Sequence, residues 1–318
     1  MNDFDFNDQP DELRDVQPSS FSHVIGQENA KAALRIAVDY AFQAQKKLDD
    51  LILAGPPGLG KSALVSVLAD ELAVPFMEIL AQSVSSAAEL NSVLLSASNG
   101  ILFLDEIHLL SQANQHLILQ VLDKRRIFLN GGKSVQSIPV ADFTLVGATT
   151  DLDGVIQPLQ DRFKMVLHLD YYTNDELAEI VRQRCRALAW EHEPELLQAI
   201  AQRARQTPRI ALRLLQSAHR VSVAEGADSI TVAHLERACE IERISPRGLD
   251  NMQQKYVNLL AQGPLRLNVL ASMLGVSTTV LTKTVEPFLL RSGIVVKDGG
   301  IRSLTQIRQE SDTAIWRK

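Results

Sequence analysis

The sequence predicts an α/β protein with a parallel β-sheet, followed by a small all-helical domain and a C-terminal domain of three helices and a strand pair. Three observations predict this arrangement. Short apolar strands alternate with helical patterns between residues 21 and 172, which is typical of a parallel sheet flanked by helices. Helical spacing then replaces the strands. Near the C-terminus, two strand-like segments are joined at Gly299 and Gly300.

Composition limits the function classes. A chain of 318 residues favours two or three domains. The net charge of −6 gives no overall basic field, so any nucleic-acid contact needs a local patch. Cys185 and Cys239 lack metal-ligand spacing and are expected to be buried free thiols. We expect residues 1–18 to be a disordered acidic tail and not a signal peptide. No apolar run is long enough for a membrane span, so the expected location is the cytoplasm.

The first domain is predicted over residues 19–172. Its expected strands are residues 51–54, 75–80, 100–104, 143–147 and 165–169. Between the third and the fourth, Asn130, Gly131 and Gly132 separate two strand-like pieces, which predicts a β-hairpin.

The second and third domains are predicted over residues 173–243 and 244–318. Thr173 with Glu176 three residues on predicts a capping box at the start of the helical domain. After the linker "RISPRGLD", helical patterns cover residues 251–262, 266–274 and 277–291, and strands cover 294–297 and 301–304. Three helices and a two-stranded wing predict a winged helix, a common nucleic-acid-binding fold.

The segment "GPPGLGKS" follows the first strand and opens a helix, which is the context of a phosphate-binding P-loop. Glycines let main-chain N–H groups turn towards an anion, and the helix directs its positive dipole end at the phosphates. Lys61 would neutralise phosphate charge and Ser62 would ligate Mg²⁺. The alternative is a glycine-rich turn that ends in lysine by chance. The residues expected to bind nucleotide here are Gly55, Gly58, Gly60, Lys61, Ser62 and Ala63.

Polar residues follow two later strands. "ILFLDE" ends in Asp105, a predicted ligand of the Mg²⁺ shell, and Glu106, which would orient and deprotonate the attacking water. A glutamate at this position favours a hydrolysing enzyme. "FTLVGATT" ends in Thr149 and Thr150, and a hydroxyl there could bond the γ-phosphate or the water. The alternative is that both threonines only satisfy the strand end.

Two arginines are further candidates. Arg162 in "PLQDRF" could act across a subunit boundary on the transferred phosphoryl group, or form a surface ion pair with Asp161. Arg209 in "TPRIALRLL" could reach the γ-phosphate, or lie solvated on a helix face. His108 and His116 are interpreted as structural or surface residues.

In this order the motifs resemble those of the AAA+ ATPases, and most closely of the RuvB family of Holliday junction branch migration motors. The matching stretches, among them "VIGQENAKAALRIAV", "GPPGLGKSAL", "LDEIHLL" and "TPRIALRLL", span residues 21 to 292. The resemblance implies an ATP- and Mg²⁺-dependent hexamer that translocates duplex DNA in recombination and repair, with a RuvA-like partner. It also implies a sensor role for Thr150, a trans-acting role for Arg162 and a second-sensor role for Arg209. Tyr172 and Pro208 fall at positions that contact the nucleotide.

Several departures from the family pattern point to a divergent member or paralogue. Ser62 replaces a threonine, Gln160 replaces an arginine, and "VQPS" at residues 16–19 replaces "LRPK". The hairpin at residues 127–140, by which the family grips its partner, is shorter. In the wing only Lys297 and Arg302 remain as candidate DNA contacts. Two alternatives therefore stay open beside the DNA motor: an ATP-driven remodeller or switch acting on a protein, and a loader-type ATPase.

Overall fold

The computed structural model describes residues 18–130 and 135–305. The chain divides into two compact units, Met1–Leu188 with Thr207–Arg209, and Ala189–Gln206 with Ile210–Lys318. This division does not coincide with the three predicted domains, because the first helix of the predicted helical domain belongs to the first unit. The acidic tail predicted for residues 1–18 lies, apart from Pro18, outside the described residues.

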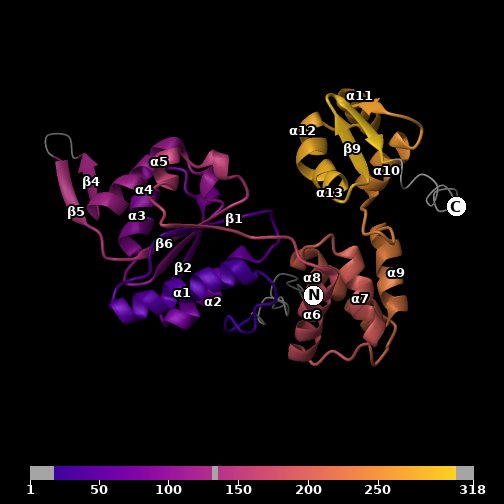
Figure 1. Ribbon diagram of the computed structural model, residues 1–318, viewed down its shortest axis with the longest axis horizontal. Coiled ribbons are helices and arrows are strands. Elements are labelled where there is room, and N and C mark those ends of the chain that lie inside the picture. The colour runs from indigo at the N-terminus through magenta and orange to yellow at the C-terminus, as the bar shows by residue number, and fades with distance from the viewer. Residues whose placement is uncertain (1–17, 131–134, 306–318) are drawn as a thin grey trace, which may run out of the picture. The chain divides into compact units, whose positions relative to one another are not determined.

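The first unit is built on a five-stranded parallel sheet in the order β2-β3-β6-β1-β7 (Figure 1). All neighbouring strands pair in parallel, as the alternation of strands and helices predicts. The interior strand β1 is buried throughout, in line with its uninterrupted apolar sequence. The strands are β1 (Leu51–Ala54), β2 (Phe76–Leu80), β3 (Ile101–Asp105), β6 (Thr144–Thr149) and β7 (Met165–His168).

In the described part of this unit, six α-helices, three short 3-10 helices and the hairpin accompany the sheet. The hairpin pairs β4 (Arg126–Asn130) with β5 (Val135–Pro139) as predicted, and its turn lies outside the described residues. The predicted capping box of Thr173 and Glu176 is present at the start of α6. The helices are α1 (Glu28–Ala44), α2 (Lys61–Leu72), α3 (Ala87–Ser96), α4 (Gln112–Lys124), α5 (Gln157–Gln160) and α6 (Asn174–Ala187).

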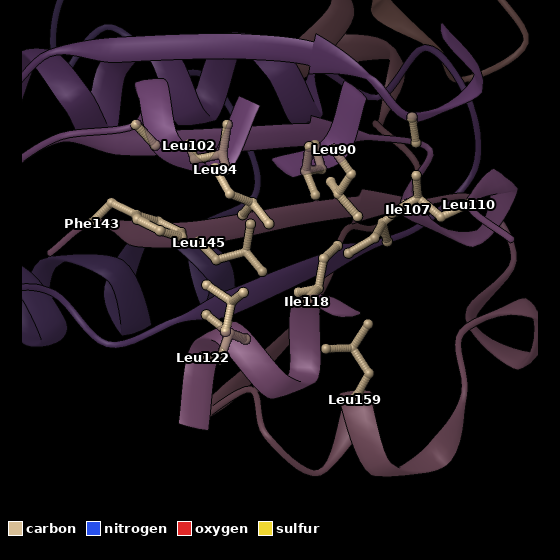
Figure 2. Close-up of a cluster of buried hydrophobic side chains, with 14 of the residues drawn as sticks. Leu90, Leu94, Leu102, Ile107, Leu110, Ile118, Leu122, Phe143, Leu145 and Leu159 are labelled. Atoms are coloured by element: carbon tan, nitrogen blue, oxygen red, sulfur yellow. The ribbon is translucent and has the colours of Figure 1, made fainter. Parts of the chain in front are cut away.

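A hydrophobic core lies between one face of the sheet and the helices α3 and α4 (Figure 2). Leu102 and Leu104 of β3 point into it, because alternate residues of a strand face the same side. Leu90 and Leu94, one helical turn apart on α3, meet Ile118 of α4 there. This packing fixes the end of β3, where the predicted acidic residues stand.

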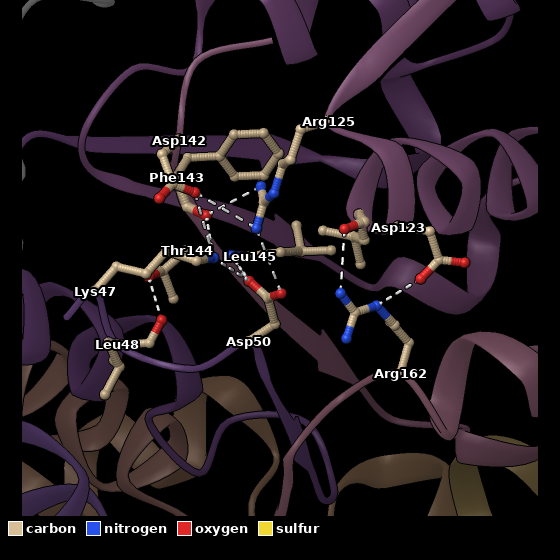
Figure 3. A network of polar contacts seen from close by, with 11 residues as sticks. Lys47, Leu48, Asp50, Asp123, Arg125, Asp142, Phe143, Thr144, Leu145 and Arg162 are labelled. Atoms are coloured by element: carbon tan, nitrogen blue, oxygen red, sulfur yellow. Dashed lines mark hydrogen bonds and ion pairs between the residues drawn. The ribbon is translucent and has the colours of Figure 1, made fainter. Parts of the chain in front are cut away.

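A polar cluster stabilises the end of the sheet at which strands β1 and β6 begin (Figure 3). Asp50, 6% exposed, accepts hydrogen bonds from the Leu145 main-chain N–H (2.8 Å) and from Lys47 Nζ (3.3 Å). Thr144 Oγ1 donates to the Leu48 carbonyl (2.7 Å). These bonds hold β1 and β6 in register, so the carboxyl ends of both strands reach the same rim.

The second unit contains a helical part and a winged helix. The helical part has α7 (Pro194–Arg203), α8 (Pro208–Ala224), whose first two residues belong to the first unit, and α9 (Val232–Glu242). The winged helix has α10 (Asn251–Leu260), α11 (Leu267–Leu274), α12 (Thr278–Val280), α13 (Glu286–Arg291), β8 (Leu265–Arg266), β9 (Val295–Asp298) and β10 (Ile301–Leu304). Two features differ from the prediction. The short strand β8 joins the wing as a third strand, and a π-helical stretch, Leu281–Val285, interrupts the third helix.

The structure contradicts the expectation that Arg302 contacts DNA. Its side chain is 3% exposed, and Nε and one terminal nitrogen donate to the two Glu286 carboxylate oxygens at 2.8 and 3.2 Å. Tyr256 donates to the same carboxylate at 2.7 Å, and burial raises the pKa of this tyrosine, which keeps it a donor. The hydrogen bonds to Glu286 raise the pKa of Arg302. Arg302 therefore ties the wing to α13 and is not available for a phosphate.

Replacing Arg302 by leucine is expected to destabilise the protein by about 3–5 kcal/mol, because Glu286 would stay buried without its cation. Urea unfolding followed by circular dichroism measures this loss. The matched control is Lys297→Ala, an exposed change on the neighbouring strand, with an unfolding midpoint close to that of the parent. Equal midpoints for Arg302→Leu and the parent would contradict a stabilising role of the pair.

Both cysteines are free and buried, as expected. Burial raises the pKa of the Cys185 thiol to about 11. Within the described residues, no helix is both long and apolar enough to cross a membrane.

Candidate nucleotide-binding and catalytic site

The predicted P-loop connects β1 to α2 in the described structure. The Gly55 N–H bonds the Thr149 carbonyl at 3.1 Å, which fixes the loop to the neighbouring strand. Gly58 has a φ of +81°, and a Cβ there would stand 3.0 Å from Cβ of Arg209. Glycine is therefore required at this position both for conformation and for space.

The N-terminus of α2 is open to an anion. Its N-cap is Gly60, which has no side chain to cap the helix. The first hydrogen bond within the helix runs from the Leu64 N–H to the Gly60 carbonyl. The main-chain N–H groups of Lys61, Ser62 and Ala63 therefore precede the first intrahelical bond and are donors for a phosphate.

Lys61 lies in the loop with little exposure, 7%, and its Nζ donates to the carbonyls of Gly55 (2.7 Å) and Pro56 (3.1 Å). Burial lowers the pKa of Lys61, and the charges of Glu106 and Asp105 partly oppose this shift. The ammonium is therefore held close to two carboxylates at the rim of the sheet.

The acidic residues near the P-loop have shifted pKa values. Burial is the main cause that raises the pKa of Asp105, and the charge of Glu106 adds to it. Glu78 of β2 is a third acidic residue, which the sequence interpretation missed. Burial and then the charge of Asp105 raise the pKa of Glu78, and a hydrogen bond from Ser62 opposes the rise. The signal was present, since Glu78 is a lone charged residue in an apolar strand.

Glu106 is held at the end of β3 in the left-handed conformation, with a φ of +53°. Its Oε2 accepts hydrogen bonds from Thr150 N–H at 3.0 Å and from Thr150 Oγ1 at 2.9 Å. His108 Nδ1 lies 3.2 Å from the same oxygen. The structure thus brings Glu106 and Thr150 together, and it adds His108, which the sequence interpretation assigned to the structural or surface residues.

Tyr172 and Arg209 lie against the P-loop. The Tyr172 hydroxyl donates to the Leu59 carbonyl at 3.1 Å, and burial raises the pKa of this tyrosine. The Arg209 N–H approaches the Gly58 carbonyl at 3.4 Å, and its charge acts on Lys61 and Asp105. Pro208, the first residue of α8, directly precedes it.

Arg162 is not assembled with these residues. Its Nε forms an ion pair with Asp123 Oδ1 at 2.8 Å, and a terminal nitrogen donates to the Leu122 carbonyl at 3.1 Å (Figure 3). Both partners belong to α4. Within the described residues, its contacts are therefore with α4 and not with the P-loop of its own chain.

Comparison with known proteins matches almost the whole chain. The P-loop domain of RuvB, described as a Holliday junction DNA helicase, matches residues 16–169, the RuvB AAA lid domain matches residues 172–245, and the RuvB C-terminal winged helix domain matches residues 246–310. The Holliday junction branch migration complex subunit RuvB of Kosmotoga olearia is 35% identical over 302 residues, covering 92% of this chain and 88% of the relative. That of Thermotoga maritima is 34% identical over 300 residues, covering 92% and 90%.

Solved structures agree with this result. The structure of Thermotoga maritima RuvB, titled Holliday junction branch migration motor, aligns with a TM-score of 0.80 at 31% identity, covering 96% of this chain and 99% of that chain. A mutant of the same protein aligns with a TM-score of 0.82 at 32% identity, covering 94% and 98%.

The fold and the site define a nucleotide-binding P-loop ATPase of the AAA+ class. Within that class, the chain belongs to the RuvB family.

Proposed function

We propose that this protein is an ATP-driven motor that translocates duplex DNA at Holliday junctions in recombination and repair. The observation that carries the proposal is the order of three RuvB domains along one chain, with the P-loop in its strand-to-helix setting. The alternative of a remodeller acting on a protein partner finds no such support.

The residues at the rim suit MgATP. Among the described residues, no three acidic, histidine or cysteine side chains form a metal site of their own, and Mg²⁺ is commonly bound by one or two carboxylates plus substrate phosphates. Ser62, the second residue of α2, carries a hydroxyl whose oxygen can ligate a cation. Asp105 and Ser62 would hold Mg²⁺, which neutralises charge on the β- and γ-phosphate oxygens when bound.

The rest of the chemistry belongs to the chain. The main-chain N–H groups of Lys61, Ser62 and Ala63, the glycine loop before them and the Lys61 ammonium bind the phosphates. Glu106 accepts a proton from the attacking water while the oxygen of that water forms a bond to the γ-phosphorus. The bond from this phosphorus to the bridging oxygen breaks, and ADP leaves with the electron pair. Thr150 holds Glu106, Tyr172 and Pro208 border the nucleotide, and Arg209 senses the γ-phosphate.

We further propose that the protein works in the cytoplasm as a homohexamer. In such a ring, Arg162 completes the site of the neighbouring subunit, which is compatible with its contacts to α4 in its own chain. A RuvA-like protein would dock on the β4–β5 hairpin.

In the wing, Lys297 is exposed and stays the candidate for a phosphate contact. Fluorescence anisotropy with a labelled four-way junction, with and without ATP, tests DNA binding. We expect binding at about 50 mM salt that weakens as salt rises. Lys297→Ala should reduce the slope of log K against log salt by about one unit.

The matched control is Lys255→Ala, an exposed lysine on α10 outside the wing, with the parental slope expected. Binding that is absent even at about 50 mM salt would contradict the DNA motor. It would favour action on a protein partner instead.

A further inference from the structure

His108 lies where the catalytic rim meets the end of β6. It belongs to the 3-10 turn Ile107–Leu109 that follows Glu106, and its side chain is 15% exposed. Its Nδ1 is 3.0 Å from Thr149 Oγ1 and 3.2 Å from Glu106 Oε2. One ring nitrogen therefore touches both strand ends that carry the proposed hydrolytic residues.

The hydrogen bonds around Thr149 determine which ring nitrogen carries the proton. Thr149 Oγ1 donates its only hydrogen to the Asp151 carbonyl at 2.8 Å and accepts from the Asp151 N–H at 3.0 Å. With that hydrogen directed at the Asp151 carbonyl, Thr149 has none to offer His108, and we assign the ring proton to Nδ1 as the donor. An unprotonated Nδ1 would also place its lone pair against the carboxylate oxygen of Glu106. Both neighbours therefore favour the Nδ1–H form.

Two hydrogen bonds converge on one carboxylate oxygen, and the His108 ring nitrogen that bonds Thr149 lies 3.2 Å from the same oxygen. Oε2 of Glu106 receives the N–H and the hydroxyl of Thr150, and the His108 Nδ1–H lies beside them. Among the residues that the structure describes, none makes a hydrogen bond to Oε1. The carboxylate is thus fixed through one oxygen while the other stays available for a water molecule.

We infer that His108 is a positioning residue for the water-activating glutamate: its Nδ1–H is shared between Thr149 Oγ1 and Glu106 Oε2, and it supports the carboxylate that Thr150 holds. The inference rests on the proposed role of Glu106 in hydrolysis. His108 does not touch the phosphate or the water, and it acts only through Glu106 and Thr149.

The fold holds the ring in this place. Gly154 packs against it so closely that a Cβ on Gly154 would stand 2.9 Å from Cβ of His108. The Gly154 carbonyl is itself fixed by Gln115 Nε2 at 3.1 Å, and Gln115 is 1% exposed. The hydrogen-bonded Gln115 and Gly154 thus restrict the position of the His108 side chain by close packing.

Two substitutions separate the role of the Nδ1–H from that of the ring volume. Asparagine places its Nδ2 where Nδ1 stands, since both are two bonds from Cβ, whereas leucine fills the space without a donor. We expect His108→Leu to lower kcat for ATP about tenfold with KM little changed, and His108→Asn to keep kcat within about threefold of the parent. His108→Gln, which puts its donor at the Nε2 position, should resemble His108→Leu.

The matched control is His116→Leu, an exposed histidine on α4, with the parental rate expected. Binding of a fluorescent ATP analogue and the thermal midpoint confirm that each variant is folded and loads nucleotide. Equal kcat values for His108→Leu and His108→Asn, whether both parental or both low, would overturn the positioning role.

Glu106→Gln distinguishes this failure from that of the proposed function. We expect Glu106→Gln to bind ATP without turning it over, and the addition of His108→Leu to cause no further loss, because the two residues act as one unit. If Glu106→Gln hydrolyses ATP at the parental rate, the proposed role of Glu106 fails, and the inference fails with it. If Glu106→Gln is inactive and His108→Leu is fully active, only the inference is wrong.

Discussion

Replacing Lys61 by alanine is expected to abolish ATP hydrolysis, with a loss of at least about a hundredfold in kcat/KM. The Lys61 ammonium is the cation of the P-loop itself, and it stands beside the N–H groups that open α2. Its removal leaves these dipoles without the charge that neutralises the β- and γ-phosphates. A coupled assay of ADP release measures turnover, and titration with a fluorescent ATP analogue measures binding.

The same change should not destabilise the fold. Burial lowers the pKa of Lys61, so the charged form is less favourable in the folded protein than in the unfolded chain. The ammonium therefore costs folding free energy at neutral pH, and this cost falls progressively as pH rises from the lowered pKa of the folded protein to the ordinary value of the unfolded chain. We expect an equal or higher thermal midpoint for Lys61→Ala. The exposed Lys46→Ala serves as control with parental turnover. A lower thermal midpoint for Lys61→Ala would contradict the predicted stability, and retained hydrolysis would contradict the predicted role of Lys61 in binding phosphate.

Replacing Arg162 by alanine is expected to lower ATP turnover about a thousandfold or more while nucleotide binding persists. The contacts of Arg162 are with Asp123 and Leu122 of α4, and the proposed catalytic contact is with the nucleotide of an adjacent subunit. Release from Asp123 breaks a single ion pair in which the aspartate is more than half exposed, so its cost is modest.

Mixing two inactive proteins tests the subunit arrangement. A Lys61→Ala subunit still supplies Arg162, and an Arg162→Ala subunit still supplies Lys61. In randomly mixed rings, about a quarter of the interfaces combine both intact residues, so activity should reappear. A mixture that stays inactive although size-exclusion chromatography shows mixed hexamers would contradict a trans-acting Arg162. Arg162→Ala with parental turnover would exclude any catalytic role.

Much of the fold follows from local patterns. The strands of the parallel sheet are predictable because each is a short apolar run, such as residues 51–54, bounded by polar or glycine-rich segments. The P-loop is predictable because glycine and lysine spacing has one strong physical reason. By contrast, the two-residue strand β8 carries no periodic signal, and the π-helical stretch of Leu281–Val285 depends on packing around it.

The side chains that the sequence interpretation misassigned share a cause. Arg302 occurs beside Lys297 in a predicted wing, and sequence alone does not show that it faces inwards to Glu286, 16 residues earlier. His108 and Glu78 likewise obtain their roles from strands that are distant in sequence and meet at one rim. Spacing along the chain predicts local contacts, whereas these depend on tertiary pairing.

The meeting of Gly58 with Arg209 has a consequence for how the ATPase site matures. The two residues are 151 positions apart (209 − 58), yet only Arg209 and its neighbours Thr207 and Pro208 return to the first unit. Closing so long a loop carries an entropic cost that the local glycine turn does not. During synthesis, the P-loop leaves the ribosome long before Arg209, so the contact at Gly58 cannot form until the start of α8 has been made.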